Sequence, residues 1–235
     1  MIPLLTTNEQ ALSFGIQSIN HAFQGLKSGD FAVLHGHPFC KTLIFKLCVH
    51  CQLPKEKGGL DSSTIYVDGG NSFNPYEISA IAQEFGSDPK STLERVFVSR
   101  AFTAYQLSAI VLETLEDALK RYRSKLVLIS KITSLFLDRD VPTKEALGIF
   151  RKMISHLADL ALRRNIIVVA TCSDSGYSKR QIVLESILLG RAGKIARFTE
   201  AKGRLQLTIQ NRGFPESLQL DILRNEATLE KFTEA

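Results

Sequence analysis

LHGHPFCKTLIFKL, residues 34–47, connects a strand-like run to a helix-like run through a turn. The apolar run Phe31–Leu34 enters the turn, Lys41 and Thr42 follow, and an apolar helical pattern then begins. A phosphate-binding P-loop, G-x-x-x-x-G-K-[ST], has this order of elements and uses its glycines to curl the backbone and present N–H groups to phosphate. The stretch is therefore a nucleotide site, the remnant of one, or a Lys-Thr pair that merely opens a helix.

Other residues fill both glycine positions of the P-loop pattern. When Lys41 and Thr42 are aligned, His35 falls at the first glycine, Cys40 falls at the second, and Gly36 is offset by one. The lysine that meets phosphate and the hydroxyl that meets magnesium are retained. The side chain of Cys40, however, stands where backbone freedom and close approach of phosphate are needed.

The composition indicates one globular domain, which we extend over residues 1–235 with a polar tail at 226–235. No apolar run reaches the ~18 residues of a membrane helix, and the amino terminus has no basic region of a signal peptide. Four cysteines without regular spacing suggest a reducing cytoplasm. The formal charge of +5 and the isoelectric point of about 9.0 favour an acidic partner, of which nucleic acid is the commonest.

Apolar runs rich in β-branched residues alternate with helical patterns along the chain. The predicted parallel strands are Phe31–Leu34, Thr64–Val67, Arg95–Val98, Leu126–Ile129 and Ile166–Thr171. The predicted helices are Leu43–Gln52, Tyr76–Phe85, Ala104–Tyr122 and Lys144–Arg164. After Gly193, short alternating runs predict an antiparallel meander at one edge of the sheet. The fold class is therefore α/β, with a mainly parallel sheet flanked by helices.

Several motifs, in order, resemble the core of RecA-like recombinases. FGIQSINHAFQGLKSGDFAVLHGHPFCKT (14–42) is similar to the segment that leads into the recombinase P-loop. The next segment, IYVDGGNSFNPYEISAIAQEFG (65–86), has Tyr66, Asp68, Phe73 and Pro75 in register. Further similar stretches are LERVFVSRAFTAYQL (93–107), SKLVLISKITSLF (124–136), NIIVVATCS (165–173) and TIQNRGFPES (208–217). The chain resembles the RecA/RadA recombinase superfamily, and most of all an archaeal RadB- or RadC-type paralogue without the helical amino-terminal domain. This resemblance implies a RecA-like P-loop NTPase core.

The same alignment shows departures at the positions that carry the family's chemistry. The catalytic glutamate, which positions the attacking water in the family, falls on Gly70, and the Walker B aspartate, which holds Mg²⁺ through water, falls on Ser130. Phosphoryl transfer depends on positioned water and neutralised charge. With Cys40 in the turn, we expect a lapsed ATPase without catalytic residues or a resident metal, and ATP with magnesium bound weakly or not at all. The vestigial nucleotide-binding set is Gly36, Lys41, Thr42 and Asp68.

Three other features each have a functional and a structural interpretation. Asp68 ends a buried strand, where it either binds a metal ion or caps the following turn. Cys48 and Cys51, with His50 between them, suggest zinc or redox chemistry, but no second ligand pair lies at zinc spacing. Buried free thiols on a helix are the alternative. The basic run Lys120–Lys125 indicates the solvated end of a helix.

Two segments that follow strands carry candidate DNA-binding residues. Residues 136–146, FLDRDVPTKEA, and 173–182, SDSGYSKRQI, stand where the recombinase family has its DNA-binding loops. Basic and aromatic groups there can neutralise phosphates and stack on a base. The candidates are Arg139, Lys144, Tyr177, Lys179 and Arg180. Aspartates in the same segments reduce the positive charge, so plain solvated loops are the alternative.

Residues 99–102, Ser-Arg-Ala-Phe, are similar to the polymerisation edge of recombinases. In the family, a phenylalanine-bearing linker of one protomer docks beside this stretch of the next. The resemblance therefore implies a partner interface at Arg100, Ala101 and Phe102, and bulk in Ala101→Trp is expected to block docking without unfolding. No Phe-x-x-Ala linker precedes Phe14, so we expect a monomer or small closed oligomer that joins a full-length recombinase.

The leading hypothesis is a non-catalytic recombinase paralogue that assists homologous recombination or DNA repair. It is expected to bind DNA, single-stranded and of any sequence, or a recombinase, or both. The alternatives are a DNA-dependent ATPase that uses an unorthodox P-loop through Lys41 and Thr42, and a scaffolding subunit without DNA affinity. The leading hypothesis places the protein in the cytoplasm, associated with the nucleoid.

Overall fold

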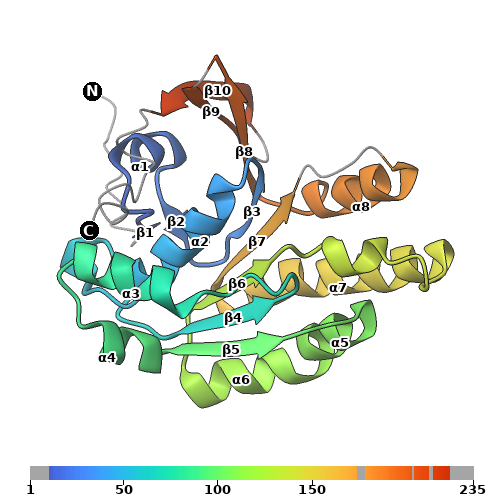
Figure 1. Cartoon of the computed structure of the whole chain (residues 1–235), viewed down its shortest axis with the longest axis horizontal. Coiled ribbons are helices and arrows are strands. Elements are labelled where there is room, and N and C mark those ends of the chain that lie inside the picture. The colour runs from blue at the N-terminus through green and yellow to red at the C-terminus, as the bar shows by residue number, and fades with distance from the viewer. Residues whose placement is uncertain (1–10, 174–177, 203, 212–213, 223–235) are drawn as a thin grey trace, which may run out of the picture.

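An eight-stranded sheet forms the centre of the molecule, with its strands in the order β10-β9-β8-β3-β7-β6-β4-β5 (Figure 1). The computed structural model describes residues 11–173, 178–202, 204–211 and 214–222. The strands are β3 (Phe31–Gly36), β4 (Thr64–Asp68), β5 (Val96–Arg100), β6 (Leu126–Ser130), β7 (Ile167–Ser173), β8 (Lys194–Ala201), β9 (Arg204–Asn211) and β10 (Phe214–Ile222). A separate antiparallel pair is formed by β1 (Ala11–Leu12) and β2 (Leu26–Lys27).

From β8 to β5, each pair of neighbouring strands runs parallel. At the other side of the sheet, β9 and β10 add antiparallel pairs. The predicted α/β class, the parallel strands and the antiparallel carboxyl-terminal edge are thus confirmed. The parallel strands end in register, since Gly36 pairs with Ser173 and Asp68 pairs with both Ser130 and Arg100. All of the predicted nucleotide-site segments therefore meet where the parallel strands end, which is called the carboxyl edge of the sheet below.

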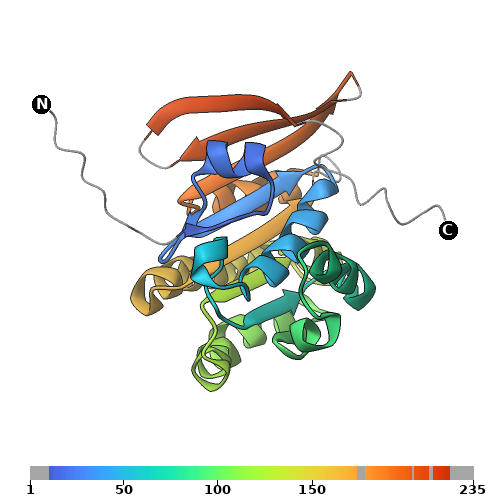
Figure 2. The same ribbon diagram turned by 90° about the vertical axis from the view of Figure 1, so that its left-hand side faces the viewer.

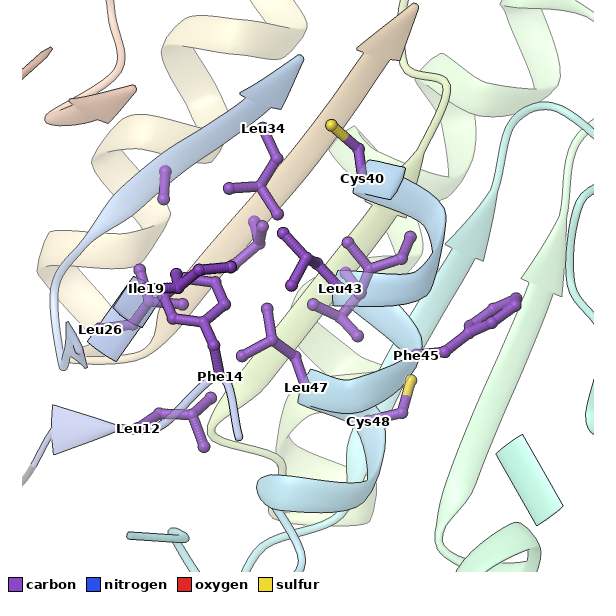
Figure 3. Packing of buried hydrophobic residues seen from close by; sticks show 14 of the residues in the cluster. Leu12, Phe14, Ile19, Leu26, Leu34, Cys40, Leu43, Phe45, Leu47 and Cys48 are labelled. Atoms are coloured by element: carbon purple, nitrogen blue, oxygen red, sulfur yellow. The ribbon is translucent and has the colours of Figure 1, made fainter. Parts of the chain in front are cut away.

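Helices cover both faces of the sheet (Figure 2). On one face lie α1 (Gln17–Phe23), α2 (Phe39–His50), α3 (Pro75–Glu84) and α4 (Pro89–Glu94). On the other lie α5 (Ala104–Ala109), α6 (Leu115–Tyr122), α7 (Thr143–Arg164) and α8 (Lys179–Leu189). Figure 3 shows Leu43 and Leu47 of α2 on the side of the helix that faces Leu34 of β3 and Phe14. Because both faces are covered, the strands read as continuous apolar runs rather than as alternating ones.

Local signals start several of these helices. Asn74, Thr103 and Ser178 cap α3, α5 and α8, and each side chain accepts a hydrogen bond from an N–H of the first turn. The run predicted as one helix, 104–122, is continuous but contains the π-helical turn Ile110–Thr114. Short 3₁₀ turns occupy Lys55–Lys57 and Ser134–Leu137. In the described part of the chain, no helix is long and apolar enough to cross a membrane.

Three differences from the sequence prediction matter for the site. Helix α2 begins at Phe39, earlier than the predicted Leu43, so the turn after β3 is short. Helix α8 was not predicted, and Lys179 and Arg180 open it rather than lying in a loop. Helices α1 and α4 were not predicted either, because each is short. The predicted tail, 226–235, lies outside the described residues.

Candidate functional site

The turn between β3 and α2 corresponds to the P-loop position, and its main-chain N–H groups are already bonded. The bonds are His37 N to Phe198 O at 2.9 Å, Phe39 N to His37 Nδ1 at 3.2 Å, Cys40 N to His37 O at 3.1 Å and Lys41 N to Pro38 O at 3.0 Å. Pro38 has no N–H group at all. From residue 37 to residue 41, therefore, no backbone donor is left for a phosphate group.

Side chains fill the space under this turn. Phe39 is buried and its ring packs edge-on against Phe198 of β8, with the ring centroids 5.6 Å apart. Cys40 is also buried, and Figure 3 shows its side chain at the first turn of α2, on the side that faces β3. Gly36 has a φ of 97°, a left-handed value that glycine adopts without strain. The conformational freedom of Gly36 allows the chain to bend at the end of β3. The residues after it form the hydrogen-bonded turn.

Lys41, the lysine of the P-loop pattern, is paired with a carboxylate of the neighbouring helix. Its Nζ lies 2.6 Å from Oε1 of Glu77 on α3, and Asn74 Nδ2 donates to the same oxygen at 2.9 Å. The Lys41 Nζ also lies 5.4 Å from the centre of the Phe45 ring. Thr42 follows in the first turn of α2 and is half-buried. A phosphate group would have to displace Glu77 before it reached the charge of Lys41.

Asp68, at the end of β4, is fully buried and accepts hydrogen bonds on both oxygens. The donors are Ser72 N at 3.0 Å, Phe73 N at 2.9 Å, Gly70 N at 3.3 Å, Ser72 Oγ at 3.3 Å and Ser130 Oγ at 2.8 Å. Burial alone would raise the pKa of Asp68, but these hydrogen bonds outweigh burial and hold the pKa below its ordinary value. This geometry favours the cap over the metal ligand, because the carboxylate is already saturated by the turn that it holds.

The two positions aligned with the catalytic glutamate and the Walker B aspartate lie beside Asp68. Ser130 is buried and donates its hydroxyl to Asp68. A Cβ placed on Gly70 would lie 2.8 Å from Cβ of Lys131, so the Lys131 side chain occupies the space that a side chain at residue 70 requires. With the backbone donors used, Lys41 paired and neither acid present, the residues at this edge do not fit ATP with magnesium.

The described residues of the two predicted DNA-binding segments follow β6 and β7, and Arg180 of the second segment contacts the first. Arg180 Nη1 donates to Asp138 O at 2.9 Å and to Val141 O at 3.0 Å, so it fastens α8 to the 138–141 loop. Its guanidinium is therefore an internal contact rather than a free phosphate ligand. Of the candidate cations, Arg139, Lys144 and Lys179 are exposed. Tyr177 lies outside the described residues.

The predicted partner interface follows β5, the last strand on its side of the sheet. Phe102 is 66% exposed, and Val98 and Tyr105 beside it are also exposed. Arg100 lies 3.5 Å from Asp68 through Nε. Ala101 is only 3% exposed and packs in the core, so the expectation that Ala101→Trp leaves folding intact is revised. Of the three predicted residues, Arg100 and Phe102 have side chains that reach the surface.

Cys48 and Cys51 lie inside the molecule on α2 and at its end. Burial raises the pKa of Cys51 to about 12 and that of Cys48 well above its ordinary value, so both thiols keep their protons at neutral pH. His50 lies between them in the sequence. It is also buried, and its ring packs against Phe85. Among the described residues, no cluster of three or more metal-binding side chains is present. This environment fits the interpretation of Cys48 and Cys51 as buried free thiols of the hydrophobic core.

The sequence did not reveal the roles of Glu77 and His37. Glu77 pairs with Lys41, and His37 accepts a hydrogen bond within the turn. A local signal existed for Glu77, because Asn74 as a helix cap with glutamate three residues later forms a capping-box pattern. Its contact with Lys41 depends on how α2 and α3 pack. For His37 no sequence signal existed, because its ring closes the turn only when the loop is short.

Comparison with known proteins gives the chain its place among families. The sequence model of the Rad51 family matches residues 11–178, which includes β3 to β7 and the whole candidate nucleotide site. The "DNA repair and recombination protein RadA" of Aeropyrum pernix is 29% identical over 165 residues, which cover 69% of this chain and 48% of that protein. The chain thus spans about half the length of this relative. Since the family match covers more than half of the chain and agrees with the observed fold, the protein belongs to the Rad51 family, within the RecA/RadA recombinase superfamily.

Proposed function

We propose that this protein is a non-catalytic recombinase paralogue that assists homologous recombination or DNA repair by binding DNA, a recombinase, or both. The observation that carries the proposal is the turn at residues 37–41, where every backbone N–H is bonded within the protein or, at Pro38, is missing. The Lys41–Glu77 pair supports the same conclusion. The name of the RadA relative supports recombination and repair as the process. The proposal includes that the protein acts beside DNA in the cytoplasm.

DNA binding is assigned to the exposed cations at the carboxyl edge of the sheet. Arg139 and Lys179 belong to segments that Arg180 holds together, so their charges are presented on one surface. Such contacts neutralise phosphates and carry no sequence information, so binding is expected to be independent of sequence. Single-stranded DNA is the expected form.

The double variant Arg139→Ala/Lys179→Ala should bind single-stranded DNA more weakly and with less dependence on salt. Loss of two phosphate contacts lowers the slope of log affinity against log salt by about 1.4 for a single strand. A titration of labelled oligonucleotide at several salt concentrations, with and without ATP and Mg²⁺, measures both quantities. We expect ATP to change neither the affinity nor the slope.

A matched control for this variant is Lys90→Ala/Lys152→Ala, which removes two exposed charges elsewhere. An unchanged slope in Arg139→Ala/Lys179→Ala would move the DNA site away from this edge. Wild-type protein that binds no DNA at all would favour the scaffolding alternative. Affinity that rises sharply with ATP would instead favour the DNA-dependent ATPase.

Binding to a recombinase is assigned to the open side of β5. The described residues pair β5 only with β4, so its other side offers unpaired backbone groups to an incoming strand. Val98, Phe102 and Tyr105 expose apolar area beside that edge. Exposed aromatic side chains of this kind dominate the binding energy of many protein interfaces. The same surface is the observation that favours a scaffolding role as the second candidate function.

The variant Phe102→Ala should weaken binding to a full-length RadA-type recombinase by roughly 30-fold or more, because loss of an aromatic anchor costs about 2 kcal/mol. Its thermal stability should match that of the wild type, because Phe102 is 66% exposed. Calorimetric titration against the recombinase measures the affinity. Tyr76→Ala is the control, since Tyr76 is an aromatic residue of α3 that is 82% exposed and is not part of the proposed surface. Equal affinities for Phe102→Ala and the wild type would contradict the assignment.

A further inference from the structure

A second group of basic residues lies at the opposite edge of the sheet, where the parallel strands begin. A cleft of about 410 Å³ opens there. Exposed Arg123, Lys125 and Arg164 line it together with the buried side chains of Leu60, Leu119 and Ile166. Ser28, Ser124 and Asn165 complete the lining, so the three exposed cations, called the rim below, adjoin a lining that is partly apolar and partly polar.

The cations of the rim come from two chain segments that only the fold brings together. Arg123 ends α6 in a left-handed conformation with a φ of 48°, and Lys125 directly precedes β6. Arg164 is the last residue of α7. The sequence run Lys120–Lys125 was interpreted as the solvated end of one helix, but the structure adds a cation of a second helix to it. The carboxyl ends of both helices attract positive charge, which explains part of this arrangement.

Helix-end stabilisation does not account for all of the charge. Arg164 Nε donates to Glu116 at 3.1 Å, and Arg163 shares that carboxylate at 3.0 Å. For Arg123 and Lys125, by contrast, the described residues provide no carboxylate within ion-pair distance. Within the described part of the chain, the positive charge of Arg123 and Lys125 is thus not balanced by an ion pair.

The neighbouring aromatic residues hold this surface in place. Tyr122 stacks on Phe97 of β5 with a centroid distance of 3.6 Å, and the Arg121 guanidinium lies 5.4 Å from the centre of the Tyr122 ring. The stacked pair fixes the end of α6, and with it the start of the cationic run. Arg123 and Lys125 follow this helix end directly, in the short connection between α6 and β6.

From these observations we propose that the cleft is a second binding site for the phosphate backbone of nucleic acid. Only the identity of the anion rests on the proposed DNA function; the charge and the shape are properties of the cleft. Lys125 stands at the amino end of β6 and the loop with Arg139 follows its carboxyl end. At about 3.3 Å per residue, the strand alone separates the two edges by roughly 15 Å. The two sites would hold two separate nucleic-acid segments, and the protein would bridge them.

The test compares four proteins for binding to a short single-stranded DNA of arbitrary sequence and for bridging of two such strands. They are the wild type, Arg123→Gln/Lys125→Gln, Arg139→Ala/Lys179→Ala and the control Lys90→Ala/Lys152→Ala. Glutamine removes the charge and keeps a polar side chain, and circular dichroism checks that each protein is folded. Energy transfer between donor-labelled and acceptor-labelled strands measures bridging, and titrations across salt concentrations measure affinity.

We expect Arg123→Gln/Lys125→Gln to abolish bridging while one strand still binds at the other edge. At the cleft, the slope of log affinity against log salt should fall by about 1.4. Bridging and affinity equal to those of the wild type and the control would overturn the second site alone. Wild-type protein that binds no single strand would contradict both this site and the proposed DNA binding.

Discussion

Asp68→Ala should lower the free energy of unfolding by about 3–5 kcal/mol, since it strips a buried carboxylate from the donors that surround it. The N–H groups of Ser72 and Phe73 and the hydroxyl of Ser130 would remain buried without an acceptor. The turn after β4 would lose the group that organises it. Urea unfolding followed by circular dichroism measures the change.

Asp88→Ala is the matched control for Asp68. Asp88 is also an aspartate that accepts a hydrogen bond from the backbone, but it caps helix α4, is exposed and accepts one main-chain bond, from Ser91 N at 2.8 Å. Its loss should lower the free energy of unfolding by only about 1 kcal/mol. Equal, small effects for the two variants would show that Asp68 is not a structural cap. Stabilisation of the wild type by Mg²⁺ that disappears in Asp68→Ala would identify a metal ligand instead.

Acidification should destabilise the protein by about 3 kcal/mol between pH 6.5 and pH 4 through His50 alone. Burial, helped by the nearby charge of Lys46, lowers the pKa of His50 from 6.5 to about 4. The ring packs against Phe85, and among the described residues neither ring nitrogen has a hydrogen-bond partner. The unfolded chain therefore binds a proton below pH 6.5 that the folded protein refuses until about pH 4, so stability is complete above pH 6.5 and falls as the pH drops.

The measurement for His50 is the free energy of unfolding as a function of pH for the wild type and His50→Phe. Phenylalanine keeps the ring against Phe85 and cannot titrate, so the difference between the two proteins isolates the histidine. Asp68 affects the free energy of unfolding at lower pH. Because its pKa is depressed, its stabilising contribution is present above the ordinary carboxyl range and is lost as the pH falls below that range. Parallel curves for the two proteins between pH 6.5 and pH 4 would contradict the buried neutral ring.

Much of the fold could be predicted from the sequence, because each parallel strand is a continuous apolar run such as Leu126–Ile129. Because both faces of such a strand are covered, polar side chains do not interrupt its apolar sequence pattern. Two of the missed helices, α1 and α4, are short, with 7 and 6 residues. Helix α8 was read as a loop because its cap, Ser178, stands beside the basic pair Lys179 and Arg180, which suggested a DNA contact.

At the candidate site, the sequence could indicate which residues are absent but not what replaces their contacts. Gly70 and Ser130 were identified by alignment alone. The pairing of Lys41 with Glu77 joins two helices, and the closure of the turn by His37 depends on where α2 starts. Such contacts follow from packing and carry no periodic signal in the chain. The role of Asp68 remained open in the sequence for the same reason, since its donors are backbone groups of a turn.

The central claim is that the turn between β3 and α2 accepts no nucleotide phosphate. Titration of ATP with Mg²⁺ into the wild type and Lys41→Ala, with and without single-stranded DNA, tests this claim when phosphate release is followed in the same samples. The account predicts no saturable binding to the wild type and no phosphate release above the level of Lys41→Ala. Saturable ATP binding and DNA-stimulated phosphate release by the wild type, both lost in Lys41→Ala, would contradict it.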